Sequence, residues 1–166
     1  MTDISNNGCI YGIAYGIGSS ANMFVDNISI EINNASGDRV YSIVAIIHSQ
    51  SNVNITSTSI SLTDIDVEWY ISGIAYTIRD SANMFVDNIS IEINNASGEG
   101  IYSCIYGVAY YIDSHSNITI TSTNISLTDI DVNSSIYGIA YDIGSSGGYA
   151  NILIDNTSIK INNVSG

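Results

Sequence analysis

Two histidines are the side chains in this sequence best suited to moving protons. His48 and His115 lie in similar segments, and each has a serine as its neighbour. A serine becomes a nucleophile when an imidazole accepts its proton and a carboxylate orients that imidazole. No motif here orients such a triad, and histidines in turns rich in Asn and Ser are usually solvated. We therefore expect no catalytic residue and no enzyme activity.

Paired carboxylates are the next candidates for chemistry. They occur twice on one face of an expected strand, as Asp64 with Asp66 and as Asp129 with Asp131. Oxygen ligands of this kind bind Ca²⁺ when several pairs converge. The glycine signatures of known calcium loops are missing, so the sequence favours a solvated acidic edge. We expect no metal and no cofactor.

The two cysteines, Cys9 and Cys104, lack the spacing of a zinc or iron–sulfur site. Two interpretations stay open for them. They are two buried thiols, or they form a disulfide within or between subunits, which an oxidising exterior would allow.

Tyrosine is the most unusual component, with twelve residues in the chain. Two sets of tyrosines each share one position of an internal repeat: Tyr11, Tyr41, Tyr106 and Tyr137, and then Tyr15, Tyr76, Tyr110 and Tyr141. If the repeats stack, each set forms an aromatic ladder. Such ladders suit packing against another sheet or subunit, or a stripe that binds carbohydrate.

The charge of the chain excludes several partners. Sixteen acidic residues face three basic ones, Arg39, Arg79 and Lys160, which gives a net charge of -13. Nothing in this set neutralises phosphates, so we expect no nucleic-acid partner. The basic residues are also too scattered for the cluster that an enzyme acting on acidic sugars needs. No run of about 18 apolar residues is present, so we expect no membrane insertion.

The elements that must position these residues are repeats. ANMFVDNISIEINNASG at 21–37 recurs unchanged at 82–98 and returns as ANILIDNTSIKINNVSG at 150–166, while a second version at 52–67 returns at 117–132. We name the two versions A and B, and their order is A-B-A-B-A. The chain is predicted to be a single repetitive β domain over 1–166, with units near 10–39, 40–70, 71–100, 101–135 and 136–166.

Apolar residues alternate with small or polar ones within each unit, as in Tyr11, Ile13, Tyr15 and Ile17, which is typical of a strand. The alternation slips at Asp26-Asn27 and again at Asn33-Asn34. Each unit therefore predicts about three short strands joined by Asn, Asp and Ser corners.

The predicted fold is all-β, a parallel β-solenoid of about five coils of roughly 30 residues. An antiparallel β-meander built from five hairpins is the alternative, although Asn-Gly or Asp-Gly turns between the strands are missing. In the solenoid the repeated isoleucines stack into a common core. One polar position never varies, and its residues are predicted to form a hydrogen-bonded ladder along the axis: Asn22, Asn52, Asn83, Asn117 and Asn151.

A family resemblance is carried by Tyr-Gly-Ile, then Ser-Ser or Ser-His-Ser, then Asn and alternating Ile with Asn or Thr, as in YGVAYYIDSHSNITITSTNISL. These units resemble the parallel β-helix repeats of pectate-lyase-like and copper-enzyme-maturation proteins, and the Asn- and Thr-rich repeats of archaeal adhesin-like and sheath proteins. The resemblance covers about 10 to 166 and implies a surface protein. These coils are longer than those usual in such families.

The ends of the repeat array favour polymerisation. No cap is visible, and IKINNVSG at one end looks able to continue into DISNNGCIYGIAY at the other. We expect copies to assemble into an extracellular, cell-surface sheath, filament or coat. The alternative is a fragment of a glycan-binding adhesin or fibre. Weaker hypotheses are a carbohydrate-active enzyme and an ice-binding protein, the latter suggested by Thr56-Ser57-Thr58 and Thr121-Ser122-Thr123.

Ten Asn-x-Ser/Thr sequons are compatible with glycosylation at a cell surface: Asn27, Asn34, Asn54, Asn88, Asn95, Asn117, Asn124, Asn133, Asn156 and Asn163. Repeat duplication multiplies whatever sequons the first copy held. Asn117 is a doubtful acceptor because it also belongs to the predicted ladder.

Overall fold

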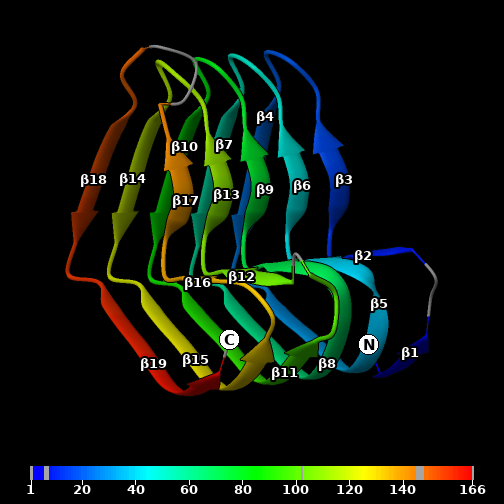
Figure 1. Cartoon of the computed structure of the whole chain (residues 1–166). Coiled ribbons are helices and arrows are strands. Elements are labelled where there is room, and N and C mark those ends of the chain that lie inside the picture. Colours follow the sequence, from blue (N-terminus) through cyan, green and yellow to red (C-terminus); the bar gives the residue numbers. More distant parts are fainter. Residues whose placement is uncertain (1, 6–7, 102, 145–147, 166) are drawn as a thin grey trace.

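The structure, a computed structural model, describes residues 2–5, 8–101, 103–144 and 148–165. These residues form a parallel β-solenoid of about five coils, which follow one another along the axis in sequence order (Figure 1). The paired strands run parallel throughout, as in β4 with β7 and β11 with β15. The predicted solenoid is confirmed, and the antiparallel meander is not formed.

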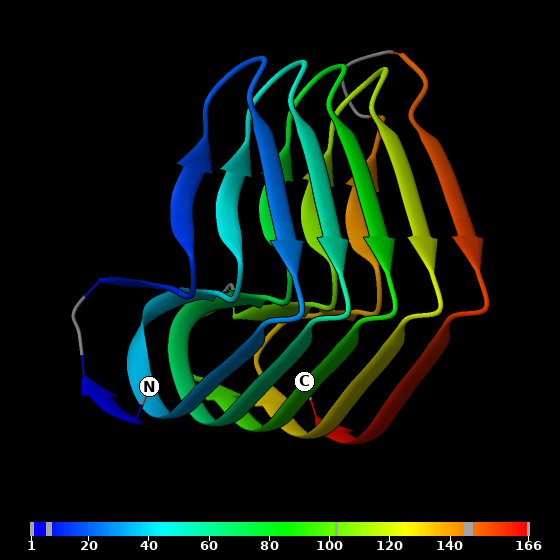
Figure 2. The same cartoon turned by 180° about the vertical axis from the view of Figure 1, so that it is seen from behind.

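Three sheets run along the solenoid. Sheet A contains β1 (Thr2–Ser5), β5 (Ser29–Tyr41), β8 (Ser59–Ser72), β11 (Ser90–Gly98), β15 (Asn124–Val132) and β19 (Ser158–Ser165) in that order. Three short strands extend it, β2 (Cys9–Tyr11), β12 (Cys104–Tyr106) and β16 (Ile136–Tyr137). Sheet A curves around the broad end of every coil (Figure 2).

Sheets B and C face each other above sheet A (Figures 1 and 2). Sheet B consists of β3 (Ala14–Ile17), β6 (Val44–Ile47), β9 (Ala75–Ile78), β13 (Ala109–Ile112) and β17 (Ala140–Ile143). Sheet C consists of β4 (Asn22–Asp26), β7 (Asn52–Thr56), β10 (Asn83–Asp87), β14 (Asn117–Thr121) and β18 (Asn151–Asp155). We call residues 9–38 the first coil and residues 135–165 the fifth coil.

The corners of the coil are made by residues with positive φ, a conformation that Asn and Asp tolerate better than most residues. One set follows sheet C, at Asn27, Ser57, Asn88, Ser122 and Asn156, and another bends sheet A, at Asn34, Asp64, Asn95, Asp129 and Asn163. At the second bend Thr63 and Asp64 both avoid the core, so that Leu62 and Ile65 are both buried. The predicted slips in alternation are these corners, although the second lies inside a continuous strand.

The core is a set of apolar rows along the axis. At one position Ile32, Leu62, Ile93 and Leu127 are fully buried and stack in register. Fully burying such a side chain contributes about 1.5–3 kcal/mol, and each row is buried only because a neighbouring coil covers it.

The invariant asparagines stack in register at the first residue of each sheet C strand. Asn52 Nδ2 donates a hydrogen bond to Asn22 Oδ1 at 2.9 Å, and Asn83 Nδ2 donates to Asn52 Oδ1 at 3.0 Å. These side chains are exposed, so their bonds hold the surface rather than the core together.

The alternation of A and B units makes neighbouring coils complementary in their outward polar groups. Thr56 Oγ1 donates to Asp26 Oδ1 at 2.6 Å, and Asn95 Nδ2 donates to Asp64 Oδ1 at 2.5 Å. In each pair the carboxylate belongs to one unit type and the neutral donor to the other. Two like charges directly opposite would destabilise the sheet, and the alternation avoids them at these positions.

Candidate functional site

The fifth coil presents its core side chains to solvent. Ile143, Ile154, Ile159 and Ile161 are each 42–50% exposed. Their strands, β17, β18 and β19, are the last in sheets B, C and A within the described residues. An apolar row beside an unpaired strand edge is a template on which another strand can pair.

The first coil differs although it is the same type of unit. Ile17, Val25, Ile30 and Ile32, which match the four residues above, are at most 8% exposed. Strand β1 pairs with residues 33–36 of β5 and covers part of sheet A there. These four rows are therefore open at the fifth coil and covered at the first, although Ile13 and Ile28 of the first coil are 41% and 39% exposed.

At one outward-facing position of sheet A, the side chain is acidic in the first and third coils and basic in the fifth. The residues at this position, in coil order, are Glu31, Ser61, Glu92, Ser126 and Lys160. Both other A units carry glutamate where the fifth coil carries lysine. Lys160 and Glu31 are exposed and lie on opposite end coils.

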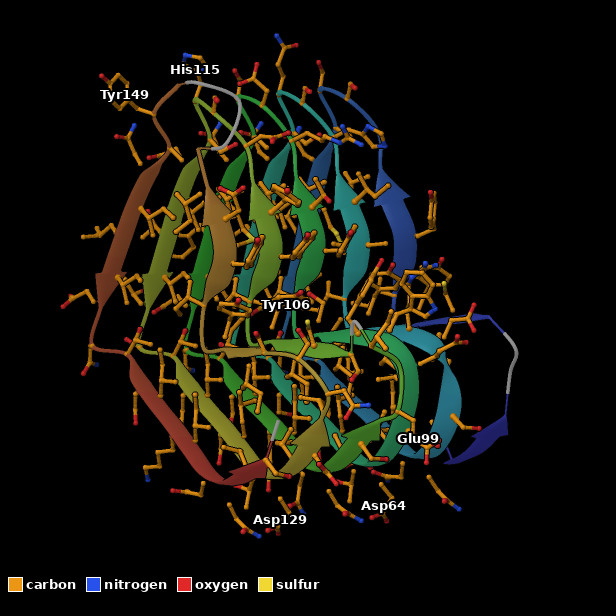
Figure 3. The ribbon with its side chains drawn as sticks, in the orientation of Figure 1. Asp64, Glu99, Tyr106, His115, Asp129 and Tyr149 are labelled. Carbon is orange, nitrogen blue, oxygen red and sulfur yellow. The ribbon has the colours of Figure 1, made fainter. Side chains whose placement is uncertain are left out.

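The tyrosines form ladders along the line where sheet A meets sheet B. Rings of the same set stack with interplanar angles of 7–13°: Tyr11 on Tyr41, Tyr106 on Tyr137, Tyr76 on Tyr110 and Tyr110 on Tyr141. Rings of the two sets also meet, as Tyr106 and Tyr110 do at 5.0 Å. Figure 3 shows Tyr106 in front of the strands at this line.

Each ladder has one gap, at Ala45 in one set and Ser72 in the other. Tyr70 closes the Ser72 gap, because its ring stacks on Tyr76 at 4.6 Å and its hydroxyl accepts a hydrogen bond from Tyr41 at 3.3 Å. Sequence reasoning missed Tyr70, since it lies outside both repeat positions.

Arg39 and Trp69 stand beside Tyr70. The Arg39 guanidinium lies 5.0 Å from the centre of the Trp69 ring and 5.2 Å from that of Tyr70, which is cation–π geometry. Trp69 belongs to a segment in which the second coil has one residue more than the first, and β5 and β8 change register there. The repeat alignment gave no signal for this contact.

These side chains line a groove of about 450 Å³. Six tyrosines contribute to it: Tyr70, Tyr76, Tyr106, Tyr110, Tyr137 and Tyr141. Burial raises the pKa of Tyr41 and of Tyr110 to about 12, and it also raises the pKa of Tyr106, with a further contribution from a hydrogen bond to Cys104. The phenols of Tyr41, Tyr106 and Tyr110 therefore keep their protons to a higher pH than an ordinary tyrosine does.

The two cysteines are not joined to each other. Cys9 lies in β2 and receives a contact of 3.6 Å from the Arg39 guanidinium, while Cys104 lies in β12 and is buried. A disulfide within one chain is absent, and the buried-thiol interpretation fits Cys104.

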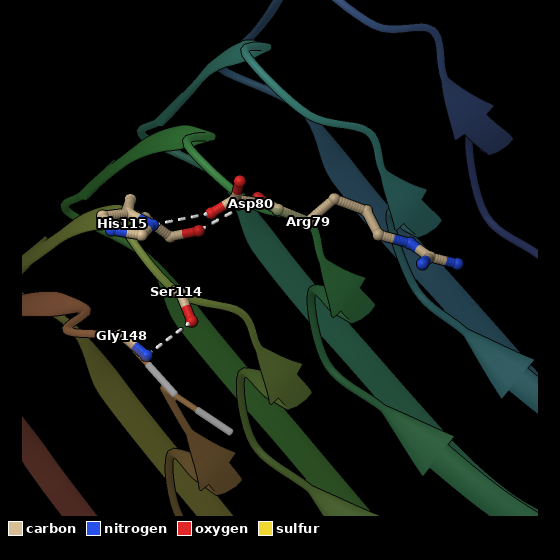
Figure 4. Close-up of polar contacts among 6 residues, drawn as sticks. Arg79, Asp80, Ser114, His115 and Gly148 are labelled. Carbon is tan, nitrogen blue, oxygen red and sulfur yellow. Dashed lines mark hydrogen bonds and ion pairs between the residues drawn. The ribbon is translucent and has the colours of Figure 1, made fainter. Parts of the chain in front are cut away.

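The sequence placed a serine beside each histidine as a possible partner. His115 Nδ1 instead lies 3.1 Å from Asp80 Oδ1, at an exposed corner (Figure 4). The Ser114 hydroxyl accepts a hydrogen bond from the Gly148 amide, and Ser116 donates to the Arg79 carbonyl. These bonds direct both serines to the backbone, and His48 lies at the equivalent corner of the second coil.

The paired aspartates do not converge. Asp64 and Asp129 lie along the bend of sheet A (Figure 3), and Asn95 of the intervening coil separates them. Among the described residues no group of three or more His, Cys, Asp or Glu could hold a metal ion. The threonine segments form no flat array either, because Thr58 and Thr123 are buried.

Comparisons with protein-family models, with curated proteins and with solved structures found no match to this chain. The described residues also contain no helix long and apolar enough to cross a membrane.

Proposed function

We propose that this chain is a structural protein whose copies stack coaxially, the fifth coil of one on the first coil of the next, into an extracellular sheath, filament or coat. The open fifth coil carries the proposal. Its apolar rows and the free edges of three sheets are what another coil of the same shape would cover. A second copy supplies such a coil.

Continuing the register across the junction gives complementary contacts. Lys160 meets Glu31 of the next copy, whereas Glu31 and Glu92 face serines within one chain. Tyr137 and Tyr141 meet Tyr11 and Tyr15 of the next copy, and both ladders continue. One pair opposes stacking, because Asp155 meets Asp26. Salt screens this repulsion together with the attraction between Lys160 and Glu31.

Strand β1 sets a condition on this stacking. Residues 2–5 pair with residues 33–36 of β5, which is the place that the end of β19 takes in a continued stack. β1 must leave for the sheets to join along their whole length. Deleting residues 1–5 therefore speeds assembly.

A charge exchange tests the junction. Lys160→Glu is expected to raise the protein concentration needed for assembly several-fold, measured by light scattering and electron microscopy, and adding Glu31→Lys restores the wild-type concentration. The matched control is Glu92→Lys, which changes charge at the same position inside the stack and leaves assembly intact. A wild-type protein that stays a dispersed monomer at high concentration contradicts the proposal.

The extracellular location is supported by the sequons. Six of their asparagines lie exposed at corners of the coil: Asn27, Asn34, Asn88, Asn95, Asn156 and Asn163. Expression in a glycosylating host, followed by mass spectrometry, tests whether these corners accept glycans. Unmodified sequons after secretion from that host count against this location.

A second candidate function is glycan binding, favoured by the tyrosine groove. Aromatic rings and phenol hydroxyls are the groups with which proteins hold neutral sugars, and the groove offers both without a carboxylate among its lining residues. A glycan array tests it, with Trp69→Ala as the groove variant and Phe24→Ala as an exposed aromatic control outside the groove. Binding that Trp69→Ala leaves unchanged excludes the groove as the glycan site.

A further inference from the structure

The tyrosine rings form an unbroken path along the solenoid. Centroid distances are 5.9 Å from Tyr41 to Tyr70, 4.6 Å to Tyr76, 4.9 Å to Tyr110 and 5.2 Å to Tyr141. The path crosses from the second to the fifth coil. Neighbouring rings on this path therefore have centroids less than 6 Å apart.

The path continues from Tyr41 through Tyr11 to Tyr15, so it is reached from solvent at both ends. Tyr141 is 51% and Tyr15 62% exposed, whereas Tyr41 between them is 5% exposed. The ring of Tyr141 stacks on that of Tyr110 with an interplanar angle of 13°. An oxidant that reaches Tyr141 therefore finds the ring of its coupling partner already stacked on it, whereas Tyr15 meets Tyr11 edge to face at an interplanar angle of 88°.

We propose that the tyrosine path is a site of oxidative cross-linking, at which Tyr110 and Tyr141 become joined as dityrosine. The oxidant is hydrogen peroxide acting through a haem peroxidase. Each phenol gives up one electron and one proton, and the two radicals form a carbon–carbon bond between ring positions ortho to the oxygens. The two ring hydrogens move to those oxygens, so one peroxide is reduced to two waters.

The bond has a structural consequence. Tyr110 lies in β13 and Tyr141 in β17, which pair in register, so one cross-link ties the fifth coil to the fourth. The fifth coil is the one with exposed core rows, and it gains most from a covalent tie. The reaction needs a single copy of the chain and does not depend on stacking.

The experiment treats dilute full-length protein with a haem peroxidase and hydrogen peroxide. The expected product is a monomer with dityrosine fluorescence, whose yield per molecule does not change on dilution. Cleavage before aspartate then releases one cross-linked peptide pair, residues 87–112 with residues 131–141, and tandem mass spectrometry places the bond. The pair is lost in Tyr141→Phe, which keeps the ring and removes the oxidisable hydroxyl.

Tyr149→Phe is the matched control, because Tyr149 is 88% exposed and more accessible than Tyr141. Cross-linking that depends on ring contact survives this change. Three results overturn the proposal: no dityrosine in the folded monomer, loss of the product in Tyr149→Phe but not in Tyr141→Phe, or an equal yield of the same peptide pair from the urea-unfolded chain. Failure of copies to stack leaves each of these readouts unaffected.

Discussion

The two ends of this solenoid are built from the same type of unit and behave differently. Val25 of the first coil is 3% exposed, and its counterpart Ile154 of the fifth coil is 46% exposed. Both strands are edge strands of sheet C. The number of strand partners therefore does not decide how well a core side chain is covered.

The difference teaches where the stability of a repeat protein is located. In a solenoid each coil contacts its neighbours, so stability is close to a sum of coil and interface terms. A core residue of an interior coil is covered by a neighbouring coil on each side, whereas the matching residue of the fifth coil is covered on one side only. Identical substitutions at matched positions should thus have unequal costs.

The largest expected effect comes from truncating one core row at two places. Ile93→Ala in the third coil removes a fully buried side chain and should lower the free energy of unfolding by about 2–5 kcal/mol. Ile161→Ala changes the same row in the fifth coil, where the side chain is 42% exposed, and should cost roughly half as much. Urea denaturation of the monomer, followed by circular dichroism, measures both.

Equal costs for the two variants would break the comparison, because they would mean that the fifth coil is as well covered as the third. Repeating the measurement at a concentration where copies stack sharpens it. The cost of Ile161→Ala should then rise toward that of Ile93→Ala.

Much of this fold follows from internal repetition. Superposing the five units identified the buried isoleucines, the stacked asparagines and the tyrosine sets without any other protein. The slips of alternation at Asn27 and Asn34 marked corners, because a residue with positive φ keeps two successive side chains out of the core. Residues that share a repeat position lie next to one another in neighbouring coils, so the repeat predicts these contacts directly.

Features that break the repeat were not predictable in the same way. Tyr70 and Trp69 reach the groove from a segment whose length differs between coils, so alignment gives them no counterpart. The difference in exposure between Val25 and Ile154 was not predictable either, because the two residues share one repeat position. The order of A and B units was visible, but its reason, a donor opposite each carboxylate, needed the register.

A smaller effect is expected at alkaline pH, and it separates an interior tyrosine from one at the end. Burial raises the pKa of Tyr41 from 10.0 to about 12, so the folded protein holds this proton more tightly than the unfolded chain. Its contribution, of the order of 1 kcal/mol, is complete below pH 10 and disappears as the pH rises toward 12. Tyr41→Phe should reduce this alkaline loss of stability.

Tyr141→Phe is the control at the open end, since the Tyr141 side chain is half exposed. Comparing the two variants at each pH separates the effect of Tyr41 from the general effect of removing one tyrosine hydroxyl. Unfolding by urea at pH values between 9 and 12 gives the profiles. A Tyr41→Phe profile identical to that of the wild type would show that burial does not raise the pKa of Tyr41.

The smallest effect tests the alternation of charge at the bend of sheet A. Asn95 lies between Asp64 and Asp129 of the two neighbouring coils, whereas Asn163 has Asp129 on one side within the chain. Asn95→Asp thus creates two contacts between like charges, and Asn163→Asp creates one. Each exposed contact should cost about 0.2–1 kcal/mol, so the interior variant should lose about twice as much stability.

Salt distinguishes repulsion from the loss of the amide donor, which both variants share. Raising the ionic strength to about 1 M shortens the screening length to about 3 Å and should bring the two variants together. If the two variants instead lose the same stability at low and at high salt, the cost is that of the lost hydrogen bond, which they share. The A-B order would then be a means of pairing donors with acceptors, and separating charges would be its by-product.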